Sequence, residues 1–292
     1  MNSTQLETFL KIVETRNFTS AANMLGYAQS TVTTQIKQLE EELGCLLFDR
    51  LGKTLALTSE GERLLSYAEK MLSLEREILL EVPANKEPAG EIKVGVSESL
   101  CYSTFPPVLL EYKKRYPKMD IRLQFIDHDT FPLLLKKGVL DLVYTLNPLM
   151  ENTELTLIQK KKETLGFYAS PKHPLAKSKS ITEKDLEGIP LLLTSHNCSF
   201  RHMLLEDFQK MSVTPNIVLE TSSKEVLKQF AMNELGIAFM PDMVANAEVK
   251  DKKLVRLNWK GNDFPIYSQL FIHKDKHIGK AIDELIKLIT DK

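Results

Sequence analysis

The sequence predicts an α/β protein of two parts: a small helical domain with a two-stranded wing, joined by a long helix to a larger α/β region of two lobes. Three observations predict this organisation. Apolar residues recur at helical spacing up to about residue 82, a loop-like stretch containing two prolines follows at 83–90, and strand-like and helical segments then alternate to the C-terminus. A chain of 292 residues is long enough for about two or three domains.

A helix-turn-helix is predicted over residues 17–44. A first apolar stripe at helical spacing is interrupted at residues 26–28, and a second helix then restarts the same period. The apolar residues are Phe18, Ala21, Ala22 and Leu25 in the first helix and Val32, Ile36, Leu39 and Leu43 in the second. Asn17 or Thr19 can cap the first turn. A helix over residues 3–15, with Leu6, Phe9, Leu10 and Val13 on one face, is expected to pack beneath the pair.

With its apolar face buried, the second helix of this unit must turn short polar side chains outward. These are Gln29, Ser30, Thr31, Thr33, Thr34, Lys37 and Gln38. In a major groove such side chains can hydrogen-bond base edges or phosphates, so the face predicts contact with double-stranded DNA. An ordinary solvated helix face is the alternative. Residues 46–57 then alternate as a hairpin whose tip carries Arg50 and Lys53, which we expect to contact phosphates together with Lys37.

This N-terminal pattern resembles that of the LysR-type transcriptional regulators. The matching residues are Phe18, Ala21-Ala22, Leu25, Gln29, Leu39-Glu40, Leu43-Gly44, Leu47-Phe48, Arg50, Leu57-Thr58 and Gly61. The resemblance implies a DNA-binding transcriptional regulator with a winged helix-turn-helix. It also implies an effector domain of two lobes like those of periplasmic solute-binding proteins. Thr34 and Ser30 depart from the family pattern, which often has a basic residue and a proline at these positions.

A long helix is predicted from a cap at Thr58 to about Val82. Its apolar residues, among them Leu65, Leu72 and Leu79, follow a heptad-like spacing, and the helix is too long for the winged domain to cover. We therefore expect it to form a homodimer with the same helix of a second subunit; folding back onto the C-terminal half is the alternative. The family resemblance implies the same dimer and, through the C-terminal lobes, a homotetramer.

The predicted domains are a winged helix-turn-helix at 1–58, a linker helix and hinge at 59–89, and an effector-binding region at 90–292. The last divides into one lobe of about 90–162 with 268–292 and another of 163–267. Strands are expected at 92–96, 121–125, 140–144, 165–169, 190–194, 217–219, 237–240 and 267–272, and helices at 104–115, near 130–137, and at 199–211, 223–233 and 278–290.

Hydroxyl side chains follow several of these strands, where open α/β sheets bind ligands and helix N-termini offer N–H groups to anions. The expected effector contacts are Ser97, Ser99, Cys101, Thr145, Ser195, Asn197, Arg201 and Ser222. Arg201 is the only guanidinium near these strand ends, and its planar fork suits a carboxylate. A salt bridge of Arg201 with Glu206 or Asp207 is the alternative. The set favours a small anionic effector.

Enzymatic activity, a metal site and a bound cofactor are not expected. The motifs GxSxG, HExxH, GxGxxG and the Walker loop are absent, and the six histidines have no metal-ligand spacing. Two other interpretations stay open. One is a redox-responsive regulator acting through Cys101 and Cys198, and the other is a solute-binding or enzymatic α/β protein with an accessory helical domain.

Net charge, cysteine spacing and the length of the apolar stretches indicate in which compartment the protein works. The net charge of −1 gives no overall attraction to nucleic acid, so any DNA-binding charge must be local. The three cysteines have no paired spacing, which indicates a reducing compartment. No stretch approaches the roughly 18 apolar residues of a membrane span, and no leader pattern is recognisable at the start. A cytoplasmic protein without membrane association is therefore expected.

Overall fold

The computed structural model describes residues 1–51, 54–81, 88–127 and 129–291. Its N-terminal domain consists of α1 (Ser3–Thr15), α2 (Phe18–Leu25), α3 (Gln29–Leu43) and the hairpin of β1 (Phe48–Leu51) and β2 (Thr54–Leu57). The predicted winged helix-turn-helix is confirmed. Asn17 caps α2 by accepting a hydrogen bond from the Ser20 N–H at 3.0 Å. Gly26 and Gly44 end α2 and α3 in the left-handed region, which glycine adopts without strain.

The core of this domain explains why α3 faces outward. Leu6, Phe9 and Ile12 of α1 are fully buried, as are Ala21 and Ala22 of α2. These two small side chains let α2 sit close to α3, whose buried face consists of Val32, Ile36 and Leu39. The ring of Phe48 packs on Phe9 and Phe18 and ties the wing to the helices. The polar face of α3 is left at the surface.

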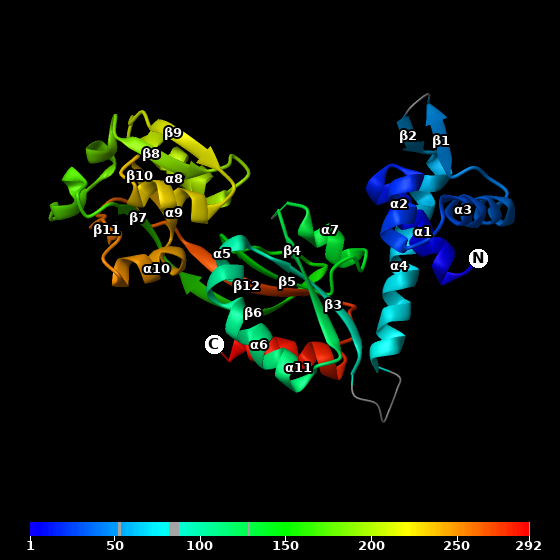
Figure 1. Cartoon of the computed structure of the whole chain (residues 1–292). Coiled ribbons are helices and arrows are strands. Elements are labelled where there is room, and N and C mark those ends of the chain that lie inside the picture. The colour runs from blue at the N-terminus through cyan, green and yellow to red at the C-terminus, as the bar shows by residue number, and fades with distance from the viewer. Residues whose placement is uncertain (52–53, 82–87, 128, 292) are drawn as a thin grey trace.

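The linker helix α4 (Ser59–Glu81) leaves the winged domain and runs down to the first lobe (Figure 1). Thr58 caps it, because its Oγ1 accepts the Gly61 N–H at 3.0 Å. Leu65 and Leu72, predicted to hold a dimer, are half-buried against the core of their own winged domain. These two side chains therefore pack at least in part within their own subunit, because α4 starts beneath the winged domain. The side chain of Leu79 lies outside the described residues.

One face of α4 docks on the first lobe of its own chain. Glu69 pairs with Lys137 at 3.3 Å, and Ser73 is buried beside Gly138. Arg76 donates from Nη2 to the Gly138 carbonyl at 2.9 Å. Gly138 has φ +68°, and a Cβ there would lie 2.5 Å from the Ser73 hydroxyl oxygen, so only glycine fits. The helix thus folds back onto its own C-terminal half over this stretch.

The first lobe is built on a five-stranded sheet in the order β4-β3-β5-β12-β6. The strands are β3 (Gly90–Val96), β4 (Met119–Phe125), β5 (Leu142–Asn147), β6 (Leu155–Glu163) and β12 (Ile266–His273). β3 is parallel to β4 and β5, and β12 is antiparallel to both its neighbours. The helices are α5 (Glu98–Ser103), α6 (Phe105–Arg115), α7 (Phe131–Lys136) and α11 (Lys280–Thr290), of which α6 and α11 pack together against the sheet (Figure 1).

The second lobe has a sheet in the order β11-β7-β10-β8-β9. Its strands are β7 (Leu165–Ala169), β8 (Pro190–Thr194), β9 (Asn216–Thr221), β10 (Ile237–Pro241) and β11 (Val255–Arg256), and its helices are α8 (Ser199–Lys210), α9 (Lys224–Met232) and α10 (Asp242–Lys250). Short 3-10 turns lie at Pro174–Lys177 and Glu183–Leu186. The chain enters this lobe after β6 and leaves it before β12, so two connections join the lobes. The α/β fold of two lobes is as predicted.

Several elements were not predicted from the sequence, among them β6, α5, α10, the two-residue strand β11 and the two 3-10 turns. β6 contains three consecutive lysines, which are not typical of a strand, but it is an edge strand and these lysines stay exposed. α5 and α10 are short and follow strands β3 and β10 directly, so their few apolar residues merge with the strand patterns.

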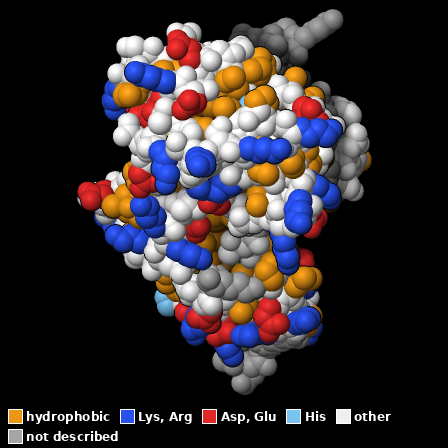
Figure 2. All heavy atoms as spheres, turned by 90° about the vertical axis from the view of Figure 1, so that its left-hand side faces the viewer, with side chains coloured by type: hydrophobic (Ala, Val, Ile, Leu, Met, Phe, Trp, Pro, Cys, Tyr) orange, Lys and Arg blue, Asp and Glu red, His pale blue; other side chains and the backbone are white. Residues whose placement is uncertain are grey.

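Charges are mixed over the surface of the lobes. Figure 2 views the molecule from the side of the two lobes and shows lysine, arginine and carboxylate side chains intermingled, with small apolar areas between them. Among the helices that the structure describes, none is long and apolar enough to span a membrane.

Candidate functional site

The outward face of α3 presents the predicted DNA-contacting residues. Gln29, Ser30, Thr31, Thr34 and Lys37 are exposed, whereas Thr33 is half-buried and donates from its hydroxyl to the Gln29 carbonyl at 2.9 Å. The Thr19 hydroxyl donates to Gln29 Oε1 at 3.0 Å, which holds this side chain in place and leaves its NH2 group as a donor.

The start of α3 is open to an anion. Ala28 occupies the N-cap and makes no side-chain cap bond, so the first N–H groups of the helix are not covered by a side chain. Lys37 lies further along α3. Its ammonium is 3.8 Å from the Glu41 carboxylate, and both side chains are largely exposed. Lys53 lies outside the described residues, as does the side chain of Arg50.

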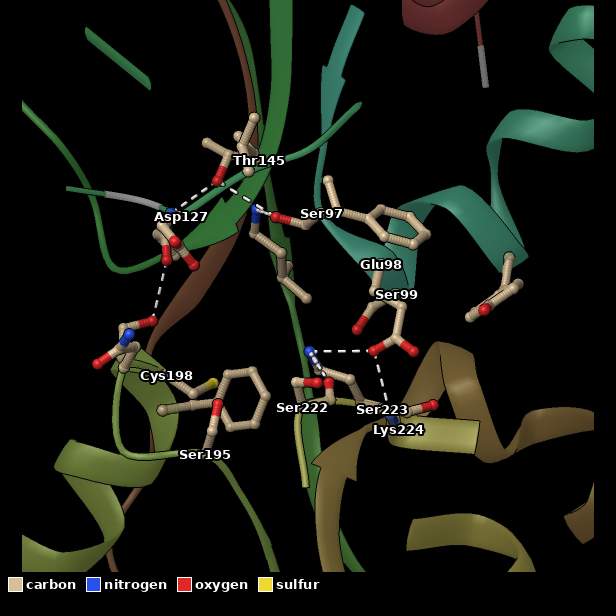
Figure 3. A pocket seen from close by; sticks show the side chains of 18 residues that line it. Ser97, Glu98, Ser99, Asp127, Thr145, Ser195, Cys198, Ser222, Ser223 and Lys224 are labelled. Carbon is tan, nitrogen blue, oxygen red and sulfur yellow. Dashed lines mark hydrogen bonds and ion pairs between the residues drawn. The ribbon is translucent and has the colours of Figure 1, made fainter. Parts of the chain in front are cut away.

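A cavity of about 420 Å³ lies between the two lobes (Figure 3). Six of the eight predicted effector contacts line it: Ser97, Ser99, Thr145, Ser195, Asn197 and Ser222. In the first lobe Ser97 follows β3, Ser99 lies in the first turn of α5, and Thr145 lies in the C-terminal half of β5. The other three follow the ends of β8 and β9 in the second lobe. The carboxyl ends of parallel strands therefore bring these hydroxyls together.

A chain of polar side chains crosses the cavity wall from one lobe to the other. The Ser97 hydroxyl oxygen accepts the Leu146 N–H at 3.0 Å and lies 3.3 Å from the Thr145 hydroxyl. Asn147 donates to that hydroxyl at 2.6 Å and accepts from the hydroxyl of Ser199, in the second lobe, at 3.0 Å. Sequence reasoning missed Asn147, although the two-residue period of β5 places it on the same face as Thr145.

An ion pair also joins the lobes at this cavity. Glu98, in the first turn of α5, lies 3.1 Å from the ammonium of Lys224, the first residue of α9. The same carboxylate oxygen accepts the Lys224 backbone N–H at 3.0 Å. Both side chains are mostly buried, at 11% and 16% exposure, which protects the pair from solvent screening. Figure 3 shows these bonds beside Ser99 and Ser222. Neither residue was predicted, because the pairing depends on how the lobes face each other.

The structure does not bring Arg201, predicted to orient an effector, to the cavity. Its buried guanidinium donates to the Thr194 carbonyl at 2.7 Å and pairs with Glu220 at the same distance. This hydrogen-bonded pair lowers the pKa of the Glu220 carboxyl. The alternative of a salt bridge is correct, but the partner is Glu220 on β9 rather than Glu206 or Asp207.

The structure does not bring Cys101 to the cavity either. Cys198 lines the cavity, but Cys101 packs against the hydrophobic core instead, because it sits on the inner side of α5. All three cysteines are free thiols. Burial raises the pKa of the Cys101 thiol, and the nearby Glu98 carboxylate adds to that effect.

We expect Cys101 to react slowly with thiol reagents. The thiolate is the reactive form, and its population falls as the pKa rises. Alkylation by iodoacetamide at pH 8, followed by peptide mass spectrometry, should be slower at Cys101 than for free glutathione. Rapid alkylation of Cys101, or a disulfide between Cys101 and Cys198 after peroxide treatment, would instead favour the redox interpretation.

Comparison with known proteins agrees with both parts of the structure. Residues 3–62 match the family described as bacterial regulatory helix-turn-helix protein, lysR family, and residues 85–292 match the LysR substrate binding domain. The uncharacterized HTH-type transcriptional regulator YwqM of Bacillus subtilis (strain 168) is 35% identical over 289 residues, covering 99% of this chain and 98% of that protein. The HTH-type transcriptional regulator YtlI of the same organism is 28% identical over 304 residues, covering 100% and 94%.

Solved structures share the fold. A full-length variant of OxyR from Pseudomonas aeruginosa has a TM-score of 0.71 at 22% identity, covering 99% of this chain and 94% of that one. Full-length CbnR complexed with its target DNA has a TM-score of 0.70 at 19% identity, covering 100% and 99%. The relatives named here are regulators of transcription and not enzymes, as the sequence predicts. The chain therefore belongs to the LysR family and is a DNA-binding transcriptional regulator with a LysR substrate binding domain.

Proposed function

We propose that this regulator reads a specific DNA sequence through α3 and changes its activity when a small molecule with an oxyanion group, such as a carboxylate, enters the cavity between the lobes. The observation that carries the proposal is the division of α3 into a buried apolar face and an exposed face of short polar side chains. Such a face can enter the major groove without bulky side chains holding the helix away. Because its partner would be chromosomal DNA, we also propose a cytoplasmic location.

In this proposal Gln29, Ser30, Thr33 and Thr34 contact base edges, and Thr31 lies on the same face. The open N–H groups at the start of α3, together with Lys37, Arg50 and Lys53, contact phosphates. The CbnR complex is a structure with target DNA of a protein with the same fold. Its existence supports this mode of binding for the present chain.

Replacing Gln29 and Lys37 separately tests the DNA-binding roles. A preferred duplex is first selected from a random library with the full-length protein. Gln29→Ala is expected to cost on the order of 1–3 kcal/mol and to relax preference at one base position. Lys37→Ala should weaken all duplexes alike and lower the slope of log K against log salt by about 0.9.

Lys250→Ala serves as a matched control, because Lys250 is an exposed lysine in the second lobe. It should change neither the affinity nor the salt slope. If Gln29→Ala weakens all duplexes equally, with no position losing its preference, then α3 does not read base edges through this residue.

Strand β5 offers a route from the effector to the DNA-binding domain. Its C-terminal end carries Thr145 and Asn147 in the cavity wall. Just before its N-terminal end, Asp141 lies 3.7 Å from Arg76 of the linker helix. A change in the placement of β5 when an effector binds would therefore move the surface on which α4 rests. We propose that this contact couples the cavity to the position of the winged domain.

We further propose that the protein is a homodimer through α4 and a homotetramer through its C-terminal lobes. Support for the dimer comes from an apolar row on α4 that the chain itself leaves open, formed by Tyr67, Met71, Leu74 and Ile78. Support for contacts between the lobes of different subunits comes from Leu110 on α6, whose side chain is 68% exposed. A contiguous exposed apolar row such as the one on α4 is typical of interfaces.

A further inference from the structure

The electric charge of the cavity limits the effectors that it can take. Among the described residues, three side chains that are charged at neutral pH line it: Glu98, Asp127 and Lys224. The ammonium of Lys224 is already engaged by Glu98, which also accepts the Lys224 N–H. Asp127 is exposed and adds a second carboxylate. The lining therefore has an excess of negative charge and, among the described residues, no cation left for an anion to pair with.

Other groups in the same cavity are suited to an oxyanion. Ser99 is only 2% exposed, lines the cavity, and its hydroxyl has no hydrogen-bond partner among the described residues. Because Ser99 lines the cavity and its hydroxyl makes no bond within the described residues, this hydroxyl is available to a ligand that enters there. Across the cavity, α8 begins at Ser199 with Cys198 as an N-cap that makes no side-chain cap bond. The first N–H groups of this twelve-residue helix are thus uncapped beside the cavity.

We propose that the effector is a zwitterion, with a carboxylate or similar oxyanion and a protonated amine. This proposal rests on the proposed effector function of the cavity and names the class of ligand. The oxyanion would bond to the Ser99 hydroxyl and the start of α8, and the amine would lie beside Asp127. A simple anion would meet Glu98 and Asp127 with no free cation among the described residues. A simple amine would supply no acceptor for the N–H groups at the start of α8. The volume lies at the small end of the roughly 300–1,000 Å³ of ligand sites, which suits an amino-acid-sized molecule.

The competing possibility is that Lys224 leaves Glu98 and pairs with an anionic effector. That exchange would leave the Glu98 carboxylate, with 11% of its side chain exposed, without its ammonium partner in a cavity that already holds Asp127. Two unpaired carboxylates and a bound anion would then share one small site. The zwitterion avoids this accumulation of like charge, because it supplies its own cation.

Matched sets of three compounds test the proposal on the full-length protein. Each set contains one of the proteinogenic L-amino acids, its 2-hydroxy acid, which lacks the amine, and its decarboxylated amine. Melting temperature is measured against the concentration of each compound. We expect at least one amino acid to raise the melting temperature, and its hydroxy acid and amine to bind at least tenfold more weakly. A ligand at a hundred times its Kd should give a clear shift.

Variants then locate the two ends of the ligand. Asp127→Asn should reduce the preference for the amino acid over the hydroxy acid at least fivefold, and Ser99→Ala should weaken both compounds. Asp251→Asn, which removes an exposed carboxylate at the end of α10, is the control and should change neither. Tighter binding of the hydroxy acids than of the amino acids, abolished by Lys224→Met, would overturn the zwitterion and leave the proposed function standing. A melting temperature that none of the compounds changes would count against both.

Discussion

Replacing Asp141 by alanine is expected to destabilise the protein by on the order of 3–5 kcal/mol, the usual cost of removing one partner from a buried ionic cluster. Asp141 is 4% exposed. Its carboxylate accepts the Lys93 N–H at 2.7 Å and lies 3.1 Å from the Lys276 ammonium, which is also buried. Arg76 of the linker helix approaches it to 3.7 Å, and the same guanidinium nitrogen has no hydrogen-bond partner among the described atoms. Without Asp141 the Lys93 N–H loses its acceptor and this guanidinium nitrogen loses its counter-ion.

Urea unfolding followed by circular dichroism measures the effect. Asp141→Asn is the matched variant, because its amide oxygen can still accept the Lys93 N–H while the charge is lost. It should cost less than Asp141→Ala. Asp251→Ala, at an exposed site, should stay within about 0.5 kcal/mol of the parent protein. A loss below about 1 kcal/mol for Asp141→Ala would mean that the cluster does not stabilise the first lobe or its contact with α4.

The winged domain could be predicted from sequence because its determinants are local. The helical spacing of Val32, Ile36 and Leu39 specifies the buried face of α3 within a single helix, and Gly26 and Gly44 mark helix ends that require a left-handed residue. Once these positions are buried, the outward direction of Gln29 and Thr34 follows from geometry. The hydroxyls of the cavity could be predicted for a related reason, since the ends of parallel strands meet at one edge of a sheet.

The charged residues of the cavity could not be predicted, because their partners are set by tertiary structure. Arg201 was chosen as the only guanidinium near the strand ends, yet strand pairing decides its partner. The register of β8 with β9 places Glu220 opposite Leu193, next to the carbonyl of Thr194 that Arg201 also binds. Glu98 and Lys224 are 126 residues apart and meet only when the two lobes close on each other. No local sequence pattern predicts a contact between residues so far apart in the chain.

The neighbours of the linker helix could not be predicted from sequence either. Its heptad-like apolar spacing is visible in the sequence, but the structure divides its faces between different neighbours. At about 100° per residue, Glu69, Ser73 and Arg76 fall on one side of α4, which rests on the first lobe. Tyr67, Met71, Leu74 and Ile78 fall on the opposite side and are exposed, whereas Leu65 and Leu72 flank the docked side. The choice of Leu72 as a dimer contact is thus less suitable than that of Leu74.

We therefore expect Leu74→Glu to convert the proposed dimer into a monomer. Leu74 is 59% exposed within one chain, so glutamate there should leave the winged domain and its melting temperature unchanged. In a dimer that buries this row, each subunit would bring an unpaired carboxylate into an apolar seam, at a cost of several kcal/mol. Sedimentation at micromolar concentration should show the loss of the dimer. Leu72→Glu gives the contrast: it places charge against the core of the winged domain and should lower stability even in the monomer. If Leu74→Glu still sediments as a dimer while Leu72→Glu only unfolds the winged domain, the exposed row of α4 is not the interface.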